Sequence, residues 1–214
     1  MYQIKTLNLG DSNYPEKLLH IYSKPNKLYV LGDETILNDK SIAVIGCREC
    51  SKEGAKIAYE LSYGLAKKGL IIVSGLAKGI DTFSHKGAID AKGKTIAVLG
   101  SGLDVIYPKE NKELYKKIIN TGGAVISEYP VETPPHKYHF PARNRIISGL
   151  SDGVLVVEAK KRSGTMITVE HALDQGKDIY AVPGNIYNEN SYGTNELIKQ
   201  GAIPVTCIDD FWNL

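Results

Sequence analysis

The sequence of 214 residues has few cysteines, no long apolar run and no recognisable export signal. Its three cysteines, Cys47, Cys50 and Cys207, are too few and too unevenly spaced for the disulfide framework of a secreted protein, which predicts reduced thiols. No stretch of about eighteen apolar residues occurs, so no membrane-spanning helix is predicted. The first ten residues lack the basic and apolar regions of a signal peptide. We therefore expect a cytoplasmic protein.

The sequence also has little excess of charge of either sign. The formal net charge is +2, from 26 Lys and Arg against 24 Asp and Glu. This balance excludes a broadly basic, chromatin-like protein, because such binding needs positive charge over a whole face. Any nucleic-acid site must be a local patch. Arginine, which binds phosphate through two parallel hydrogen bonds and stacks on flat rings, occurs only four times. These arginines are Arg48, Arg143, Arg145 and Arg162.

From residue 41 onward, short apolar β-branched runs alternate with segments of helical periodicity, which is typical of parallel βαβ units. The predicted fold is an α/β, extended Rossmann-like three-layer sandwich with a mostly parallel sheet. The predicted strands are Ser41–Ile45, Leu70–Ser74, Thr95–Leu99, Ala124–Ser127, Gly153–Glu158, Asp178–Val182 and Ile203–Cys207. The predicted helices are Gly54–Lys68, Gly79–Ala91, Lys109–Thr121, Arg143–Leu150 and Thr165–Gln175, with a turn or helix over Asp209–Leu214.

Residues 1–40 are predicted to pack on the sheet as an N-terminal extension of the 41–214 core. A short helix opens at Tyr14–Leu18, and Lys27–Gly32 is a further strand. No repeat, low-complexity tract or linker marks a domain break, so we expect one domain over residues 1–214.

Ligands of open parallel sheets bind outside the carboxyl ends of the strands, where helix N-termini and free backbone N–H groups converge. Glycines in those loops let the backbone approach a ligand closely. The segments that follow predicted strands are Gly46–Arg48, Ser74–Gly79, Gly100–Gly102, Glu128, Arg162–Thr165 and Pro183–Gly184.

Two motifs of nucleotide enzymes are incomplete, and no cofactor is predicted. Gly100 and Gly102 begin a dinucleotide fingerprint, but its third glycine is replaced by Val105. Lys94 and its neighbours resemble the end of a phosphate-binding loop, yet the required first glycine is Ala88. Cys47 and Cys50 have the spacing of a redox motif, although we favour two small loop residues, and Cys207 does not complete a zinc site.

The segment 136–145, His-Lys-Tyr-His-Phe-Pro-Ala-Arg-Asn-Arg, interleaves cations with aromatic rings. Single-stranded DNA exposes phosphates and base faces together, so this combination favours such a ligand. For Lys137, Phe140 and Arg143 we favour binding. For Tyr138 we weigh DNA binding equally against a core position that fixes the loop. For Arg145 we weigh DNA binding equally against an ion pair that caps the helix.

These segments together resemble the DNA-processing protein A (Smf) family of bacteria over nearly the whole chain. The resemblance is carried by Gly46–Arg48, Ser74–Asp81 with His85, Thr95–Pro108, Phe140–Arg145 and Arg162–Thr168. It implies a Rossmann-like domain that binds single-stranded DNA in a basic pocket, often as a homodimer, and loads the RecA recombinase during natural transformation. It implies no catalytic residue. The chain ends at Leu214, so we expect no C-terminal winged helix.

The resemblance also implies roles for particular residues. Arg48 holds a phosphate, Lys137 and Phe140 hold backbone and base, and Ser163–Thr165 supply donors at a helix N-terminus. Arg143 and Asn144 shape the same pocket, and Lys78 is a weaker candidate. The complete predicted DNA-binding set is Gly46, Arg48, Ser74, Gly75, Lys78, Lys137, Phe140, Arg143, Asn144, Ser163, Gly164 and Thr165.

Two other functions are weighed against this one. Gly164 and Thr165 match the core of the Gly-Gly-x-Gly-Thr-x-x-Glu motif of nucleotide phosphoribohydrolases, but Thr168 stands where that motif has its carboxylate. A sensor domain that binds a small nucleotide in the same loops remains open. For self-association, the surface around Leu197, Ile198, Ile203 and Val205 is the candidate.

Overall fold

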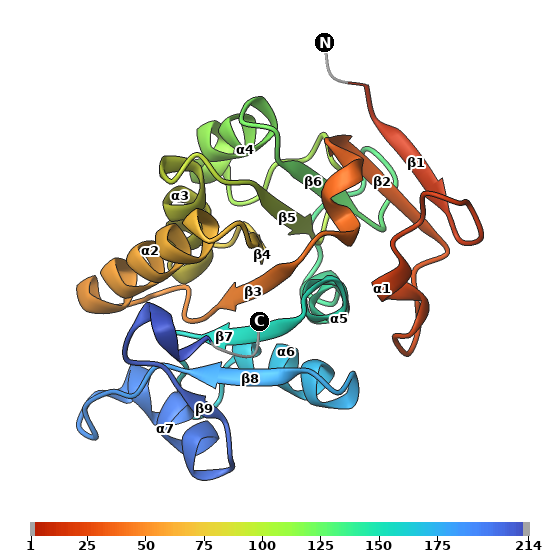
Figure 1. Cartoon of the computed structure of the whole chain (residues 1–214). Coiled ribbons are helices and arrows are strands. Elements are labelled where there is room, and N and C mark those ends of the chain that lie inside the picture. Colours follow the sequence, from red (N-terminus) through yellow and green to blue (C-terminus); the bar gives the residue numbers. More distant parts are fainter. Residues whose placement is uncertain (1–2, 212–214) are drawn as a thin grey trace.

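A nine-stranded sheet runs through the part of the chain that the computed structural model describes, residues 3–211 (Figure 1). The strand order is β1-β2-β6-β5-β4-β3-β7-β8-β9. The seven strands from β6 to β9 along this order pair in parallel, whereas β1 and β2 join the β6 edge antiparallel. The strands are β1 Lys5–Asn8, β2 Lys27–Gly32, β3 Ser41–Ile45, β4 Ile71–Ser74, β5 Thr95–Leu99, β6 Ala124–Ser127, β7 Gly153–Val156, β8 Asp178–Ala181 and β9 Ile203–Pro204.

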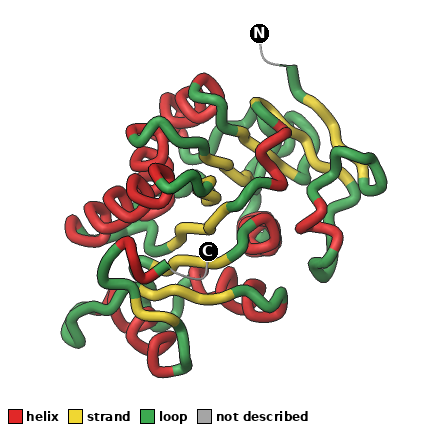
Figure 2. Tube along the Cα trace, in the orientation of Figure 1, coloured by secondary structure: helices red, strands yellow, loops and turns green. Residues whose placement is uncertain are grey.

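Helices cover both faces of this sheet (Figure 2). Apolar side chains of α1, α5, α6 and α7 pack on one face, and those of α2, α3 and α4 pack on the other. The three layers confirm the predicted Rossmann-like α/β sandwich. The helices are α1 Glu16–Leu19, α2 Lys52–Lys67, α3 Ile80–Asp90, α4 Lys112–Asn120, α5 His139–Leu150, α6 Gly164–Asp174 and α7 Tyr192–Lys199.

Strand β3 shows why the apolar runs of the sequence are continuous rather than alternating. All five of its residues are buried. Ala43 and Ile45 belong to the core under α5 and α6, whereas Ile42 and Val44 belong to the core under α2. Because successive side chains of a strand point to opposite faces, the central positions of a strand covered on both sides are all apolar, whereas Ser41 at the start of β3 is buried with its hydroxyl donating to the Leu150 carbonyl at 2.8 Å.

Several observed elements differ from the predicted ones. Helix α5 begins at His139, four residues before the predicted start, because Pro141 lies in the first turn, where its missing N–H is not needed. The predicted helix over 109–121 begins as a 3₁₀ turn, and β9 has two residues instead of five. Strand β1 was not predicted. A 3₁₀ turn occupies Ile208–Asp210, and residues 212–214 of the predicted closing element lie outside the described residues.

No helix within residues 3–211 combines the length and apolar character needed to cross a membrane.

Candidate functional site

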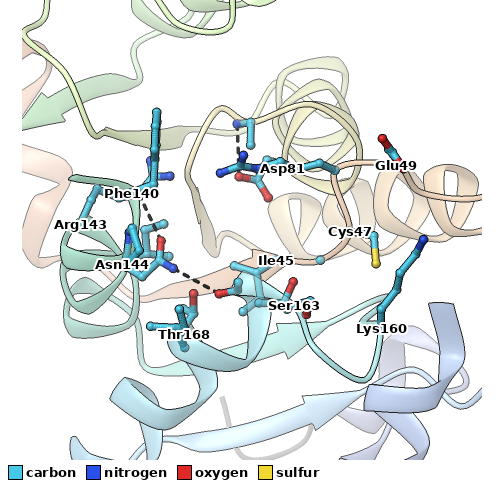
Figure 3. A pocket seen from close by; sticks show the side chains of 18 of the residues that line it. Ile45, Cys47, Glu49, Asp81, Phe140, Arg143, Asn144, Lys160, Ser163 and Thr168 are labelled. Carbon is cyan, nitrogen blue, oxygen red and sulfur yellow. Dashed lines mark hydrogen bonds between the residues drawn. The ribbon is translucent and has the colours of Figure 1, made fainter. Parts of the chain in front are cut away.

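A pocket of about 750 Å³ opens at the carboxyl ends of β3 and β7, beside the N-terminal ends of α5 and α6 (Figure 3). Its size lies within the range of small-molecule and cofactor sites. Nine of the twelve predicted residues line this pocket: Gly46, Arg48, Lys137, Phe140, Arg143, Asn144, Ser163, Gly164 and Thr165.

The other three predicted residues lie outside the main pocket. Gly75 and Lys78 line a small adjoining cavity together with Arg48 and Phe140. The ammonium group of Lys78 is 2.6 Å from the Glu110 carboxylate. Ser74 lines neither cavity, because its buried hydroxyl donates to the Val44 carbonyl at 2.7 Å. Its side chain therefore joins two strands and does not face a ligand.

Arg48 and Phe140 form the cationic and aromatic centre of the pocket. The Arg48 guanidinium carbon lies 5.4 Å from the centroid of the Phe140 ring, which is a cation–π distance. The ring centroid of Tyr107 lies 5.5 Å from that of Phe140. Arg48 and Lys137 are exposed, and neither takes part in an ion pair within residues 3–211. Both charges are therefore available to an anionic ligand.

The loop that carries Arg48 is fixed by hydrogen bonds to a buried carboxylate. Glu158 is 5% exposed and accepts hydrogen bonds from the Ser51 amide at 3.0 Å and the Ser51 hydroxyl at 2.5 Å. Asn190 donates to Glu158 at 3.1 Å and to the Glu49 carbonyl at 3.2 Å. The site prediction missed Glu158 and Asn190. A carboxylate at the end of a buried strand was the available signal for Glu158.

A glycine lets a second loop approach the Arg48 loop closely. Gly79 has a φ of 74°, and a Cβ placed there would lie 2.2 Å from the Cys47 carbonyl oxygen. The amide of Ile80 donates to the same oxygen at 3.2 Å. Any larger residue at position 79 would push the two loops apart, so the glycine helps to position Arg48.

Arg143 lies in the floor of the pocket and is 4% exposed. Its Nη1 donates to the Gly75 carbonyl at 2.8 Å and also to the Val98 carbonyl, which joins the ends of β4 and β5. Burial lowers the pKa of Arg143 to about 10, and the nearby Asp81 carboxyl opposes this shift. The guanidinium is therefore occupied by main-chain oxygens.

The N-terminus of α6 faces the pocket with unused donors. Ser163 precedes the helix, makes no side-chain cap, and has a buried hydroxyl without a hydrogen-bond partner. A Cβ built on Gly164 would meet no atom within 4 Å, so the backbone there is open. Asn144 reaches across from α5 and donates to the Gly164 carbonyl at 3.4 Å (Figure 3). A helix N-terminus with free N–H groups attracts anions, phosphate above all.

Other side chains near the pocket have different roles. Arg145 is bound in a two-pronged ion pair, with Nη1 and Nη2 each 2.7 Å from a Glu128 oxygen. This is the structural alternative that the sequence left open for Arg145. Tyr138 is 66% exposed, and the Lys137 ammonium lies 4.9 Å from its ring centroid. Glu49 and Lys160 also line the pocket and were not predicted.

The cysteine loop carries no metal cluster. Within residues 3–211, no group of three or more His, Cys, Asp or Glu side chains is placed to hold a metal ion. Burial raises the pKa of both the Cys47 and the Cys50 thiols, so both are protonated at neutral pH. This favours the interpretation of Cys47 and Cys50 as small loop residues.

The fold and the pocket define a Rossmann-like protein with a cationic, aromatic-lined site and a free helix N-terminus at the carboxyl edge of its sheet. The model of the family described as DNA recombination-mediator protein A matches residues 5–214, and the chain belongs to this family. The resemblance inferred from the motifs is confirmed.

Individual relatives agree with this assignment. The chain is 50% identical to the DNA processing protein DprA of Streptococcus pneumoniae over 205 residues, which covers 96% of this chain and 72% of that protein. It is 42% identical to DprA of Bacillus subtilis over 210 residues, or 98% of this chain and 70% of the relative.

Solved structures are similar over the whole fold. An X-ray structure of DprA from S. pneumoniae has a TM-score of 0.93 at 47% identity, and covers 99% of this chain and 74% of its own. DNA processing protein A from Helicobacter pylori, described for its single-stranded DNA binding mode, has a TM-score of 0.89 at 33% identity, with coverages of 99% and 95%. A molybdenum cofactor carrier protein from Chlamydomonas reinhardtii shares only the fold, with a TM-score of 0.53 and 21% identity.

Proposed function

We propose that this chain binds single-stranded DNA in the pocket and acts, without catalysis, as a recombination mediator that protects incoming DNA and delivers it to the RecA recombinase during natural transformation. The observation that carries the proposal is the unpaired Arg48 guanidinium over the Phe140 ring, beside Lys137 and the open N-terminus of α6. Phosphates match the cations and the helix N-terminus, and a base face matches the ring.

Single-stranded DNA fits this arrangement better than a duplex does. In a duplex the base faces are stacked inside the helix, so Phe140 would have no base to contact. The likeness to the H. pylori protein, which is described as binding single-stranded DNA, supports the same ligand. The family's description as a recombination mediator supports delivery to RecA.

Self-association as a homodimer is part of the proposal, but two of the four candidate side chains are used inside the chain. Leu197 is 4% exposed and Val205 is 1% exposed, and both pack in the core. Only Ile198 and Ile203 of that set are half-buried and can contribute to a dimer surface.

Two alternatives predict different ligands. A nucleotide sensor is favoured by the pocket size, which suits a mononucleotide. A phosphoribohydrolase needs a carboxylate beside the glycine-threonine turn, where the pocket has the buried Thr168 instead. Glu170, the nearest acid along α6, is exposed and does not line the pocket.

Fluorescence anisotropy tests the proposal with labelled oligo-dT, competed by duplex DNA and by mononucleotides at several salt concentrations. We expect preference for the single strand. Arg48→Ala and Lys137→Ala should each weaken binding and reduce the slope of log affinity against log salt by about 0.7, because each variant loses one phosphate contact. Lys117→Ala, an exposed lysine on α4 outside the pocket, is the matched control. Unchanged affinity in both pocket variants, or tighter binding of a mononucleotide, would overturn the proposal.

A further inference from the structure

A second group of cations and aromatic rings lies beside the pocket, on loops outside β7 and β8. The loop between β7 and α6 contains Lys160, Lys161 and Arg162 in succession, and all three are exposed. None of them takes part in an ion pair within residues 3–211. Lys160 lines the pocket and lies beside Cys47 (Figure 3). The positive charge therefore begins at the wall of the pocket and continues away from it.

Aromatic side chains lie along the neighbouring loop, between β8 and α7. The Lys161 ammonium is 5.2 Å from the centroid of the Tyr192 ring, which is 42% exposed as a residue. Tyr187 is 90% exposed, and its amide bonds to the Asn185 side chain at 2.9 Å in a tight turn that presents the ring outward. An aromatic ring so fully in water buries nothing in the isolated chain.

The two loops are fixed to each other by main-chain hydrogen bonds. The Ala159 amide donates to the Asn190 carbonyl at 2.7 Å, and the Gly193 amide donates to the Ala159 carbonyl at 2.7 Å. Strands β3, β7 and β8 are neighbours in the sheet and parallel, so their carboxyl ends lie side by side. The second group is therefore a lateral continuation of the same edge, with its cations one strand and its tyrosines two strands away from the loop of Arg48.

The structure assigns this outer loop surface, formed by Lys161, Arg162, Tyr187 and Tyr192, as a second binding segment for single-stranded DNA, which receives the strand after it leaves the pocket at Lys160. This inference rests on the proposed function of the pocket. Exposed acids flank the surface at Glu49 and Glu189, so its charge alone is too weak to hold a polyanion. Stacking of bases on the two tyrosines supplies the remaining attraction, which a duplex or an acidic peptide cannot use.

Binding by this surface can be distinguished from binding by the pocket through the length of the oligonucleotide, because only a long strand can reach both. Anisotropy is measured with labelled oligo-dT of about five and about twenty nucleotides, which lie near the lower end and above the upper end of the usual footprint of a single-strand site. The test variant is Lys161→Ala with Tyr187→Ala. The control is Lys67→Ala with Tyr63→Ala, which also removes one lysine and one tyrosine; this cation and ring are 5.7 Å apart near the C-terminal end of α2. That helix end lies at the opposite edge of the sheet, because α2 returns the chain from β3 to the start of β4.

We expect the test variant to bind the long oligonucleotide roughly tenfold more weakly, the loss of one stacked base and one phosphate contact. Its affinity for the short oligonucleotide should stay within about twofold of the wild type, and its salt slope should fall by about 0.7 for the long strand only. Equal losses at both lengths, or no loss at either, would overturn the inference. If the wild type binds neither oligonucleotide, the proposed function itself fails, which is a distinguishable result.

Discussion

Replacement of Arg143 tests whether this buried side chain supports the pocket or contacts the ligand. Arg143→Ala removes the donor of two hydrogen bonds, to the carbonyls of Gly75 and Val98, and leaves both oxygens without that partner in the interior. It also leaves the buried Asp81 without its nearby positive charge. Hydrogen bonds to a charged donor contribute about 1.5–3 kcal/mol each, so the loss of both costs at least about 3 kcal/mol.

We therefore expect Arg143→Ala to lower the free energy of unfolding by about 3–5 kcal/mol, measured by urea denaturation followed by circular dichroism. Arg143→Lys keeps a positive charge but lacks the planar fork, so its loss should be intermediate. Arg48→Ala, at an exposed side chain without an ion pair, should change stability by no more than about 0.5 kcal/mol while it weakens DNA binding. An Arg143→Ala protein of unchanged stability that no longer binds DNA would refute the supporting role.

Two further predictions concern helix α6 and a buried histidine. Gly164→Asp should raise the free energy of unfolding slightly, because a carboxylate is favourable at a helix N-terminus, yet weaken DNA binding about tenfold by repelling phosphate. The control Gly164→Ala should bind DNA normally. Weaker binding of both variants would contradict this prediction. Burial lowers the pKa of His85 to about 3, while its Nδ1 lies 2.7 Å from the Thr95 hydroxyl. The unfolded chain takes up a proton on His85 near pH 6.5 and the folded chain does not, so the free energy of unfolding should fall by about 2 kcal/mol between pH 7.5 and 5. In urea titrations His85→Gln should lose this pH dependence. The exposed control His20→Gln should retain it.

Much of the fold was predictable because the sheet is covered on both faces. Strands β3, β5 and β6 have the predicted boundaries, since a strand covered on both faces has a nearly continuous run of apolar residues that stands out along the chain. That residues from separate loops after the strands line one pocket was predictable for a related reason. Parallel strands bring their carboxyl ends to one edge, so glycines and cations that follow separate strands meet there.

The direction and partners of each side chain were not predictable in the same way. Arg48 and Arg143 are both arginines in motif segments, yet Arg48 is exposed over Phe140 while Arg143 is enclosed by main-chain carbonyls. Ser74 is a second example, because its hydroxyl donates to the Val44 carbonyl of the neighbouring strand β3 and not to a ligand. Strand β1 was missed because it is a short edge strand with one buried residue, so its apolar pattern is too weak to predict.

The sequence alone determined the class of fold and the family and predicted the edge of the sheet that carries the candidate site, because these depend on residue types and their order along the chain. Only the tertiary structure decided which cations remain unpaired, which carboxylate holds the Arg48 loop, and that a second cationic and aromatic surface adjoins the pocket. The position of the Arg48 loop, for example, depends on contacts between segments more than a hundred residues apart, such as Ser51 with Glu158 and Glu49 with Asn190, separated by 107 and 141 positions. No local pattern records such distances.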